Sequence, residues 1–302
     1  MPNNLIVLLG PTGVGKTDIA VEIAGIYGCE IISCDSRQFY REMSIGTAVP
    51  SEDQLSRARH HFIKFLSIKD YYSASRFETD VINMLPQLFA KNNLVMMAGG
   101  SAMYIDAVCK GYDDIPDVDP VIRDKYISLY KREGIESLRM ALKVLDPEHY
   151  SKVDLKNYKR IIRALEICDS TGKPYSAFLK NQRKSRDFRI IRIGLNRPRK
   201  ELYDLINIRV DKMLAEGLEK EARSLYEFRH LNALNTVGYK ELFDYFDRSI
   251  SYEKAIELIK RNSRRFAKRQ MTWWARDKEI KWFHPLEAAK IIEYIRKEID
   301  GS

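Results

Sequence analysis

The hydrophobic and polar positions of the first 110 residues alternate between short apolar runs and segments with helical spacing. Apolar runs occupy residues 5–9, 30–33 and 94–98, and a Gly-rich turn with a helix-like segment separates the first two. The apolar residues before the third run keep helical spacing: Phe77, Val81, Leu85 and Leu88. Strands that alternate with helices are typical of a parallel sheet with helical crossovers. The pattern therefore predicts an α/β domain.

The middle of the chain has a different pattern. Residues 112–120 are rich in turn formers, and the segment that follows has helical periodicity without a convincing strand. Residues 189–195 then alternate like a strand. We therefore predict that residues 1–112 and 188–302 form a sheet core with C-terminal helices, and that residues 113–187 are an inserted all-helical domain.

A long amphipathic segment follows Pro198. Its apolar residues keep helical spacing as far as residue 225, so we predict one continuous helix there. A Gly-containing loop over residues 235–239 separates this segment from two further predicted helices, over residues 239–246 and 251–276. The sheet core is therefore expected to end in a group of helices.

Charge is distributed unevenly over the 302 residues. The formal net charge is +9, but residues 159–200 hold 13 basic and 3 acidic residues, and residues 257–278 hold 8 basic and 2 acidic residues. These stretches contribute +10 and +6, so the remainder sums to about −7. Two concentrated basic stretches favour a polyanionic partner, with nucleic acid as the first candidate. Two solvated helix faces are the alternative.

Other features argue against several classes of protein. The longest apolar run near the start has five residues, whereas a membrane span needs roughly 20, and we recognise no leader before it. The four cysteines include no CxxC pair, which argues against a zinc ribbon or a disulfide framework. We therefore expect a cytoplasmic monomer with no membrane partner.

The strongest single motif is GPTGVGKT, which matches GxxxxGKT at every fixed position and lies between a predicted strand and a predicted helix. In such a P-loop, backbone N–H groups and the helix N-terminus bind phosphate oxygens. We expect Lys16 to reach terminal phosphates and Thr17 to ligate Mg²⁺. The predicted diphosphate-binding residues are Gly10, Pro11, Thr12, Gly13, Val14, Gly15, Lys16 and Thr17. The motif alone specifies only a ligand with a pyrophosphate-like group.

Polar or small residues follow the second and third predicted strands. Asp35 follows the second, and Gly99, Gly100 and Ser101 lie at the end of the third. Because ligands of an open parallel sheet bind outside the carboxyl ends of its strands, Asp35 should face the ligand that Lys16 holds. A carboxylate there can accept a proton or hold a metal. Asp35 is otherwise a helix cap or turn residue, or the end of a Walker B strand.

Several motifs together resemble the bacterial tRNA dimethylallyltransferases, which are tRNA isopentenyltransferases. Their order and spacing carry the resemblance, since only the P-loop is specific by itself. The motifs are GPTGVGKT, SCDSRQFY at 33–40, IGTA at 45–48, GGS at 99–101, NYKRIIRALE at 157–166, TGKP at 171–174, GYKE at 238–241 and AKRQMTW at 267–273. The resemblance extends from Leu5 to about Phe283, and no Cys/His cluster follows Phe283, which favours the bacterial form.

The resemblance implies a fold, a reaction and its substrates. The fold is a P-loop sheet core with an inserted helical domain and a channel through the core. The reaction transfers the dimethylallyl group from dimethylallyl diphosphate to N6 of the adenosine 3′ of the anticodon, with Mg²⁺ as cofactor. The donor enters one mouth of the channel, and the target base of the tRNA anticodon stem-loop is flipped into the other.

The resemblance also implies roles for individual residues. Asp35 would be the general base for the N6 amine, while Lys16 and Thr17 would hold the diphosphate and Arg209 would assist its departure. These four residues form the expected catalytic set. The residues expected to contact tRNA are Asp35, Ser36, Arg37, Gln38, Ser101, Arg123, Lys159, Arg160, Ile161, Ile162 and Arg163.

Without the resemblance, the residues support only a P-loop enzyme that acts on or near nucleic acid. An ATP-dependent small-molecule or nucleotide kinase is the first alternative, but it leaves both basic stretches unexplained. The second alternative is a non-catalytic RNA-binding protein whose P-loop is vestigial. That protein would bind tRNA equally well after Asp35→Ala and would form no product.

Overall fold

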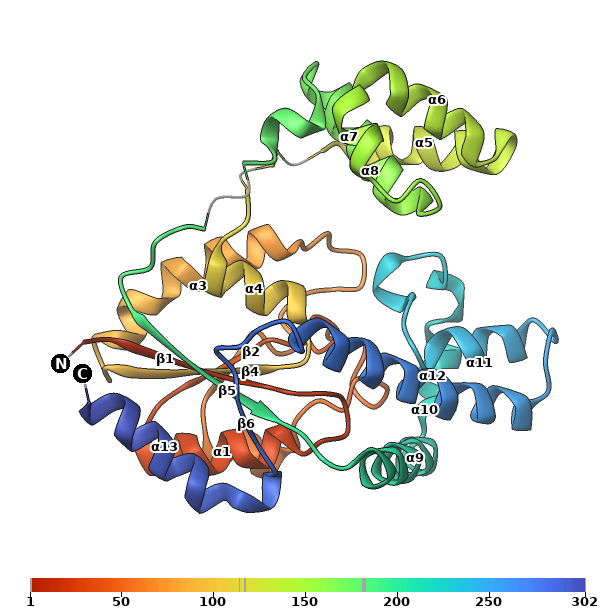
Figure 1. The fold of residues 1–302 in the computed structure, drawn as a ribbon. Helices are drawn as coiled ribbons and strands as arrows, with labels where there is room; N and C mark the ends of the chain where they lie inside the picture. The colour runs from red at the N-terminus through yellow and green to blue at the C-terminus, as the bar shows by residue number, and fades with distance from the viewer. Residues whose placement is uncertain (1, 114, 117, 181–182, 302) are drawn as a thin grey trace. The chain divides into compact units, whose positions relative to one another are not determined.

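The computed structural model describes residues 2–113, 115–116, 118–180 and 183–301 (Figure 1). The chain divides into two compact units, which we call the sheet unit (Met1–Cys109 with Ser185–Ser302) and the helical unit (Lys110–Lys184). The bounds predicted for the insertion, residues 113–187, lie three residues from this division at each end.

A six-stranded parallel sheet forms the centre of the sheet unit, in the order β3-β2-β4-β1-β5-β6. The strands are β1 (Asn4–Leu9), β2 (Ile31–Ser33), β3 (His60–His61), β4 (Leu94–Gly99), β5 (Arg189–Leu195) and β6 (Lys281–Phe283). The predicted α/β class with a parallel sheet is confirmed. The two edge strands were not predicted, because β3 has two residues and β6 has three, too few to show alternation.

Helices cover both faces of the sheet (Figure 1). Side chains of β1 alternate between these faces: Ile6 and Leu8 pack with α1 and α13, whereas Leu5, Val7 and Leu9 pack with α3 and α4. The helices are α1 (Lys16–Tyr27), α3 (Ala74–Phe89), α4 (Ala102–Lys110) and α13 (Ala288–Asp300). Because burying apolar area from water stabilises the fold, this alternation fixes the register of the central strand.

Four further helices of the sheet unit share a third core, which includes Leu218, Tyr239 and Leu242. They are α9 (Arg199–Ala215), α10 (Leu218–Ser224), α11 (Tyr239–Phe246) and α12 (Tyr252–Trp274), and the short 3₁₀ turns η2 (Tyr226–Phe228) and η3 (Asn232–Leu234) contribute to the same core. The helix α2 (Glu52–Arg57) and the 3₁₀ turn η4 (Pro285–Glu287) lie outside it. The prediction of one helix to residue 225 is wrong. Gly217 has a φ of +104°, and this left-handed residue separates α9 from α10.

The helical unit has a core of its own, which includes Tyr126, Leu138, Leu142, Ile161 and Leu165. Its helices are α5 (Pro120–Glu133), α6 (Ile135–Leu145), α7 (Pro147–Lys152) and α8 (Tyr158–Thr171), followed by the 3₁₀ turn η1 (Tyr175–Phe178). Within its described residues the unit contains no strand, as predicted. Across the described part of the whole chain, no helix is long and apolar enough to cross a membrane.

Candidate functional site

The P-loop connects β1 to α1 at the carboxyl end of the central strand. Gly13 and Gly15 have φ values of +79° and +100°, in the left-handed region that favours glycine. A Cβ at Gly13 would also lie 2.8 Å from a side-chain atom of Ile206. The glycines at these two positions therefore allow a loop conformation that a residue with a side chain would strain.

Lys16 begins α1 and turns back over the loop. Its Nζ donates hydrogen bonds to the carbonyl oxygens of Gly10 and Pro11, at 3.0 and 2.9 Å. Burial lowers the pKa of Lys16 to about 8, an effect that Asp35 partly opposes and that Arg209 reinforces. Because a buried ammonium group lacks solvation, an anionic ligand at the loop would stabilise its charged form.

Asp35 follows β2 and borders two cavities. A small cavity of about 50 Å³ is lined by Asp35 together with Lys16 and Thr17. A large cavity of about 720 Å³ is lined by Asp35 together with Arg209 and residues of α12. The Oδ1 of Asp35 accepts a hydrogen bond from the backbone N–H of Arg37 at 3.1 Å. Asp35 is thus a turn residue, which was one of the alternatives that we considered for it. Its carboxylate also lies between the P-loop and the large cavity.

The large cavity is built from seven parts of the sheet unit. Polar side chains reach it from the P-loop, from the loops after β2 and β4, from α9, from the segment before α11, from α11 itself and from α12. The polar and charged residues in its lining are Thr12, Asp35, Ser36, Arg37, Thr47, Ser101, Arg209, Asn235, Thr236, Lys240, Glu241, Asn262, Ser263, Arg265, Arg269 and Gln270. The volume is within the range of roughly 300–1,000 Å³ that is usual for small-molecule sites.

Gln270 is a site residue to which sequence analysis gave no role. Its side chain is only 6% exposed; Oε1 accepts the backbone N–H of Thr12 at 2.9 Å, and Nε2 donates to the carbonyl oxygen of Gly100 at 2.7 Å. The amide therefore joins α12 to the P-loop and to the loop after β4. Gln270 shares a buried helix face with Ala267 and Trp274. A polar residue on an otherwise apolar helix face is the sequence feature by which Gln270 could have been recognised.

Glu221 of α10 is a second residue that sequence analysis missed. Its carboxylate accepts backbone hydrogen bonds from Ser44, Ile45 and Gly46, at 2.8, 2.8 and 2.9 Å. It also accepts a hydrogen bond from the hydroxyl of Tyr239 at 2.7 Å, and the buried Tyr239 has a raised pKa, chiefly because of burial. Glu221 thus fixes the loop whose Gly46 lines the large cavity. Sequence spacing gave no sign of this long-range contact.

The predicted RNA-contact residues after β2 have different surroundings. Ser36 and Ser101 meet at the large cavity, where the Oγ of Ser101 accepts the Ser36 N–H at 2.9 Å. Arg37 also lines this cavity, but its guanidinium donates to the carbonyl oxygens of Asn232 and Ala233. Gln38 is 9% exposed and borders the small cavity, where Nε2 donates to the carbonyl oxygen of Ala48 at 2.9 Å.

The other predicted RNA-contact residues belong to the helical unit. Arg123 and Arg163 both form ion pairs with the buried Glu166, at 3.0 and 3.4 Å. Ile161 and Ile162 are buried in the unit's own core. The side chains of Lys159 and Arg160, at the start of α8, are exposed. Within this segment the free cationic surface is therefore provided by Lys159 and Arg160.

Exposed apolar side chains border the large cavity. Phe266 and Trp273, both on α12, are 40% and 46% exposed, and both line this cavity. The Nε1 of Trp273 donates a hydrogen bond to Asp106 at 2.8 Å, which fixes the indole ring. Trp274, by contrast, is 3% exposed and belongs to the core. Phe266 and Trp273 are thus available for stacking, whereas Trp274 is structural.

The donor atoms for a metal ion at this site are few. No group of three or more His, Cys, Asp or Glu residues is arranged to hold a metal in the part of the chain that the structure describes. Thr17 and Asp35 do line the same small cavity. A hydroxyl and a carboxylate are oxygen ligands of the kind that Mg²⁺ accepts when substrate phosphates and waters complete its shell. The residues therefore fit a metal that binds together with a diphosphate.

Comparison with known sequences gives consistent results. The profile of the family described as IPPT, IPP transferase, matches residues 38–277. The chain is 54% identical to tRNA dimethylallyltransferase 2 of Parabacteroides distasonis, over 98% of this chain and 99% of that protein. It is 52% identical to tRNA dimethylallyltransferase of Christiangramia forsetii, over 99% of this chain and 100% of that protein.

Comparison with solved structures extends this similarity to the fold. The full-length tRNA isopentenylpyrophosphate transferase from Bacillus halodurans matches with a TM-score of 0.72 and 33% identity, over 99% of this chain and 97% of that chain. A eukaryotic dimethylallyltransferase, described as acting on tRNA, matches with a TM-score of 0.81 and 23% identity, over 99% of this chain and 80% of that chain. At that identity the second match bears on the fold alone.

Proposed function

Because the chain belongs to the IPP transferase family, we propose that it is a tRNA dimethylallyltransferase. Its donor would be dimethylallyl diphosphate, and its acceptor would be N6 of the adenosine 3′ of the anticodon. The observation that carries this proposal is the position of Asp35, which borders both the small cavity beside Lys16 and the large cavity beside Arg209. One carboxylate can therefore meet both a diphosphate donor and a base acceptor.

In the proposed reaction, the bond between C1 of the dimethylallyl group and the diphosphate oxygen breaks, and a bond from C1 to N6 forms. N6 loses one proton, which Asp35 accepts as general base. The diphosphate leaves with additional negative charge, which Lys16, Arg209 and the N–H groups of the P-loop stabilise. Placing donor and acceptor on two sides of Asp35 orients them for this transfer.

The proposed cofactor is Mg²⁺. Thr17 would hold the ion at the small cavity, where it would neutralise charge on the diphosphate when bound. The kinase alternative is not favoured, since every relative named above is a transferase of an isoprenoid group.

The acceptor must leave its stack to reach Asp35, at a cost of roughly a few kcal/mol that stacking and edge contacts offset. Phe266 and Trp273 offer exposed aromatic surface at the large cavity, and Arg265 and Arg269 line the same cavity. These residues support the binding of an unstacked base and its neighbours. Both cavities are lined by one chain, so we expect the enzyme to act as a monomer.

Label transfer tests the proposed function. The full-length protein is incubated with Mg²⁺, an unmodified tRNA and dimethylallyl diphosphate labelled in the allyl group. We expect label in the RNA, and nuclease digestion should recover it on the adenosine 3′ of the anticodon. A parallel incubation with ATP labelled at the γ-phosphate tests the kinase alternative.

Lys16→Ala is the matched control for the donor site. This variant should bind RNA but transfer little label, because the ammonium group no longer holds the diphosphate. Phosphoryl transfer from ATP with no label from the allyl donor would contradict the proposed function. Equal label transfer by Lys16→Ala would contradict the assigned donor site.

A further inference from the structure

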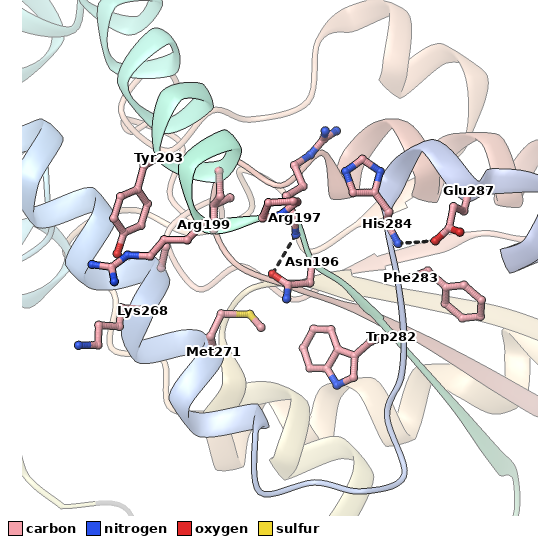
Figure 2. Close-up of a pocket in the computed structure, with 13 residues that line it drawn as sticks. Asn196, Arg197, Arg199, Tyr203, Lys268, Met271, Trp282, Phe283, His284 and Glu287 are labelled. Atoms are coloured by element: carbon pink, nitrogen blue, oxygen red, sulfur yellow. Dashed lines mark hydrogen bonds between the residues drawn. The ribbon is translucent and has the colours of Figure 1, made fainter.

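A third cavity, of about 620 Å³, is shown in Figure 2, and we call it the Trp282 cavity. The α12 residues that line it, Ala267, Lys268 and Met271, are different from those that line the large cavity. The Trp282 cavity is bounded by the carboxyl end of β5, the start of α9, β6 and α12. Its lining includes Asn196, Arg199, Lys268, Met271 and Trp282. None of these residues is used by the proposed transfer reaction.

One side of the Trp282 cavity is cationic. Figure 2 shows Arg199 and Lys268 close together beside Tyr203. Both are exposed, and neither takes part in an ion pair among the residues that the structure describes. The guanidinium of Arg199 lies over the ring of Tyr203, 5.1 Å from its centroid, which orients it. Two positive charges at this position are therefore available to an anion.

The start of α9 adds to this positive potential. Arg199 is the first residue of this 17-residue helix, and its N-cap, Pro198, makes no side-chain hydrogen bond to the first turn. Both residues line the cavity. The uncapped N–H groups and the helix dipole favour negative charge at such an end. The cations and the helix start thus point to the same kind of ligand.

Carboxylates near the cavity are already neutralised. Glu201 pairs with Arg197 and with His284, whose Nε2 lies 3.3 Å from its Oε2. Glu287 pairs with Lys290 at 2.6 Å and accepts the backbone N–H of His284. These acids would therefore repel an anion at Arg199 and Lys268 less than free carboxylates would.

The other side of the Trp282 cavity is apolar. Figure 2 shows Trp282 across the cavity from Arg199 and Lys268, with Met271 between them. Phe283 lies beside Trp282, and Leu202 also lines the cavity. An indole ring and a thioether pack well against flat or branched apolar groups. A small inorganic anion would leave this surface without contacts.

We propose that the Trp282 cavity binds a small organic phosphate. Arg199, Lys268 and the first turn of α9 hold the phosphate, and the flat or branched body of the ligand packs between Trp282 and Met271. Arg197 connects this cavity to the P-loop, because its Nε donates a hydrogen bond to the carbonyl oxygen of Val14 at 3.0 Å. A ligand in the cavity therefore lies next to a residue that supports the donor loop.

Isothermal titration calorimetry of the full-length protein, without RNA, tests this proposal. The probes are adenosine 5′-monophosphate, with a flat body; dimethylallyl monophosphate, with a branched body; and inorganic phosphate, with none. The proteins are the wild type, the double variant Arg199→Ala/Lys268→Ala, the control Arg276→Ala/Lys278→Ala and the P-loop variant Lys16→Ala. Thermal unfolding checks that each variant folds.

We expect an organic phosphate to bind at least about tenfold more tightly than inorganic phosphate. The tighter binder of the two organic probes shows whether the natural ligand has a flat body, as in adenosine 5′-monophosphate, or a branched body, as in dimethylallyl monophosphate. Binding should weaken by about tenfold or more in Arg199→Ala/Lys268→Ala, and should persist in the control and in Lys16→Ala. If binding of the organic phosphate is lost in Lys16→Ala but retained in Arg199→Ala/Lys268→Ala, the phosphate binds at the P-loop and the proposal is overturned. Equal binding of inorganic phosphate, or no binding at millimolar concentration, would also overturn the proposal. Transfer to RNA is not measured, so failure here leaves the proposed function untouched.

Discussion

At the scale of single residues, three charged groups of the site, Lys16, Asp35 and Arg209, act on one another electrostatically. Burial lowers the pKa of both Lys16 and Arg209, whereas Asp35 raises the pKa of each. The carboxylate therefore favours the charged form of these two half-buried cations while the donor is absent. The same two cations stabilise the diphosphate as it departs in the proposed reaction.

The lowered pKa of Lys16, about 8, predicts a pH-dependent donor affinity. Only the protonated amine attracts a diphosphate, so the dissociation constant of dimethylallyl diphosphate should be level below about pH 8 and rise by about tenfold per pH unit above it. Equilibrium binding across this range measures the effect. Lys16→Arg stays charged and should show no such rise, and a flat profile in the wild type would contradict the assignment.

Loss of the Gln270 amide should weaken use of the donor without unfolding the protein. Gln270→Leu removes both hydrogen bonds of the amide and leaves the Thr12 N–H and the Gly100 carbonyl without partners, so the KM for the donor should rise by about tenfold, equivalent to about 1.4 kcal/mol. Steady-state kinetics and tRNA binding measure this. Gln270→Glu still accepts from Thr12 and should recover part of the loss. A loss of tRNA affinity as large as the rise in the donor KM would indicate that Gln270 has a purely structural role.

The difference between Asp35 and Gln270 shows how far single residues could be predicted. The position of Asp35 could be predicted because it follows a recognisable strand and because parallel strands end at one edge of a sheet. Gln270 and Glu221 act through backbone groups that are 258 and 177 residues away in sequence, Thr12 and Ser44. No local pattern encodes such a contact, so only the folded chain reveals it.

At the scale of elements, close backbone approach at Gly99 sets the position of Asp35. A Cβ at Gly99, the last residue of β4, would fall far inside van der Waals contact with the backbone of Cys34, next to Asp35. Gly99→Ala should therefore destabilise the fold by about 3 kcal/mol and slow transfer. Urea unfolding measures the first effect.

Gly25→Ala is the matched control, because Gly25 is exposed on α1 and a Cβ there meets nothing within 4 Å. Helix propensity predicts that this change stabilises the protein by about 0.5–1 kcal/mol. Equal unfolding free energies for the two variants would show that the contact between β4 and the end of β2 is unimportant.

Long elements could be predicted from periodicity, and their interruptions could not. The α11 helix has the predicted bounds, Tyr239–Phe246, because a Gly-containing loop precedes its apolar face. The break at Gly217 was missed because apolar spacing continues across it to Leu225. A single glycine is tolerated within a helix, and only its left-handed φ shows that this one ends α9.

At the scale of the whole molecule, the uneven charge predicts salt-sensitive RNA binding. The basic stretches sum to +16 on a chain whose remainder is about −7. Lys159 and Arg160 are exposed in the helical unit. Lys159→Ala and Arg160→Ala should each weaken tRNA binding and reduce the slope of log affinity against log salt by about 1. Filter binding at several salt concentrations measures this, and an unchanged slope would exclude these side chains from the RNA interface.

We propose that Asp35 accepts the N6 proton between a donor cavity and an acceptor cavity. Single-turnover transfer with saturating tRNA and donor measures this role by comparing wild type, Asp35→Asn and the surface control Asp53→Asn. We predict that Asp35→Asn binds tRNA normally but transfers label about 10²–10⁴-fold more slowly, whereas Asp53→Asn matches the wild type. A transfer rate for Asp35→Asn equal to that of the wild type would show that Asp35 is not the general base.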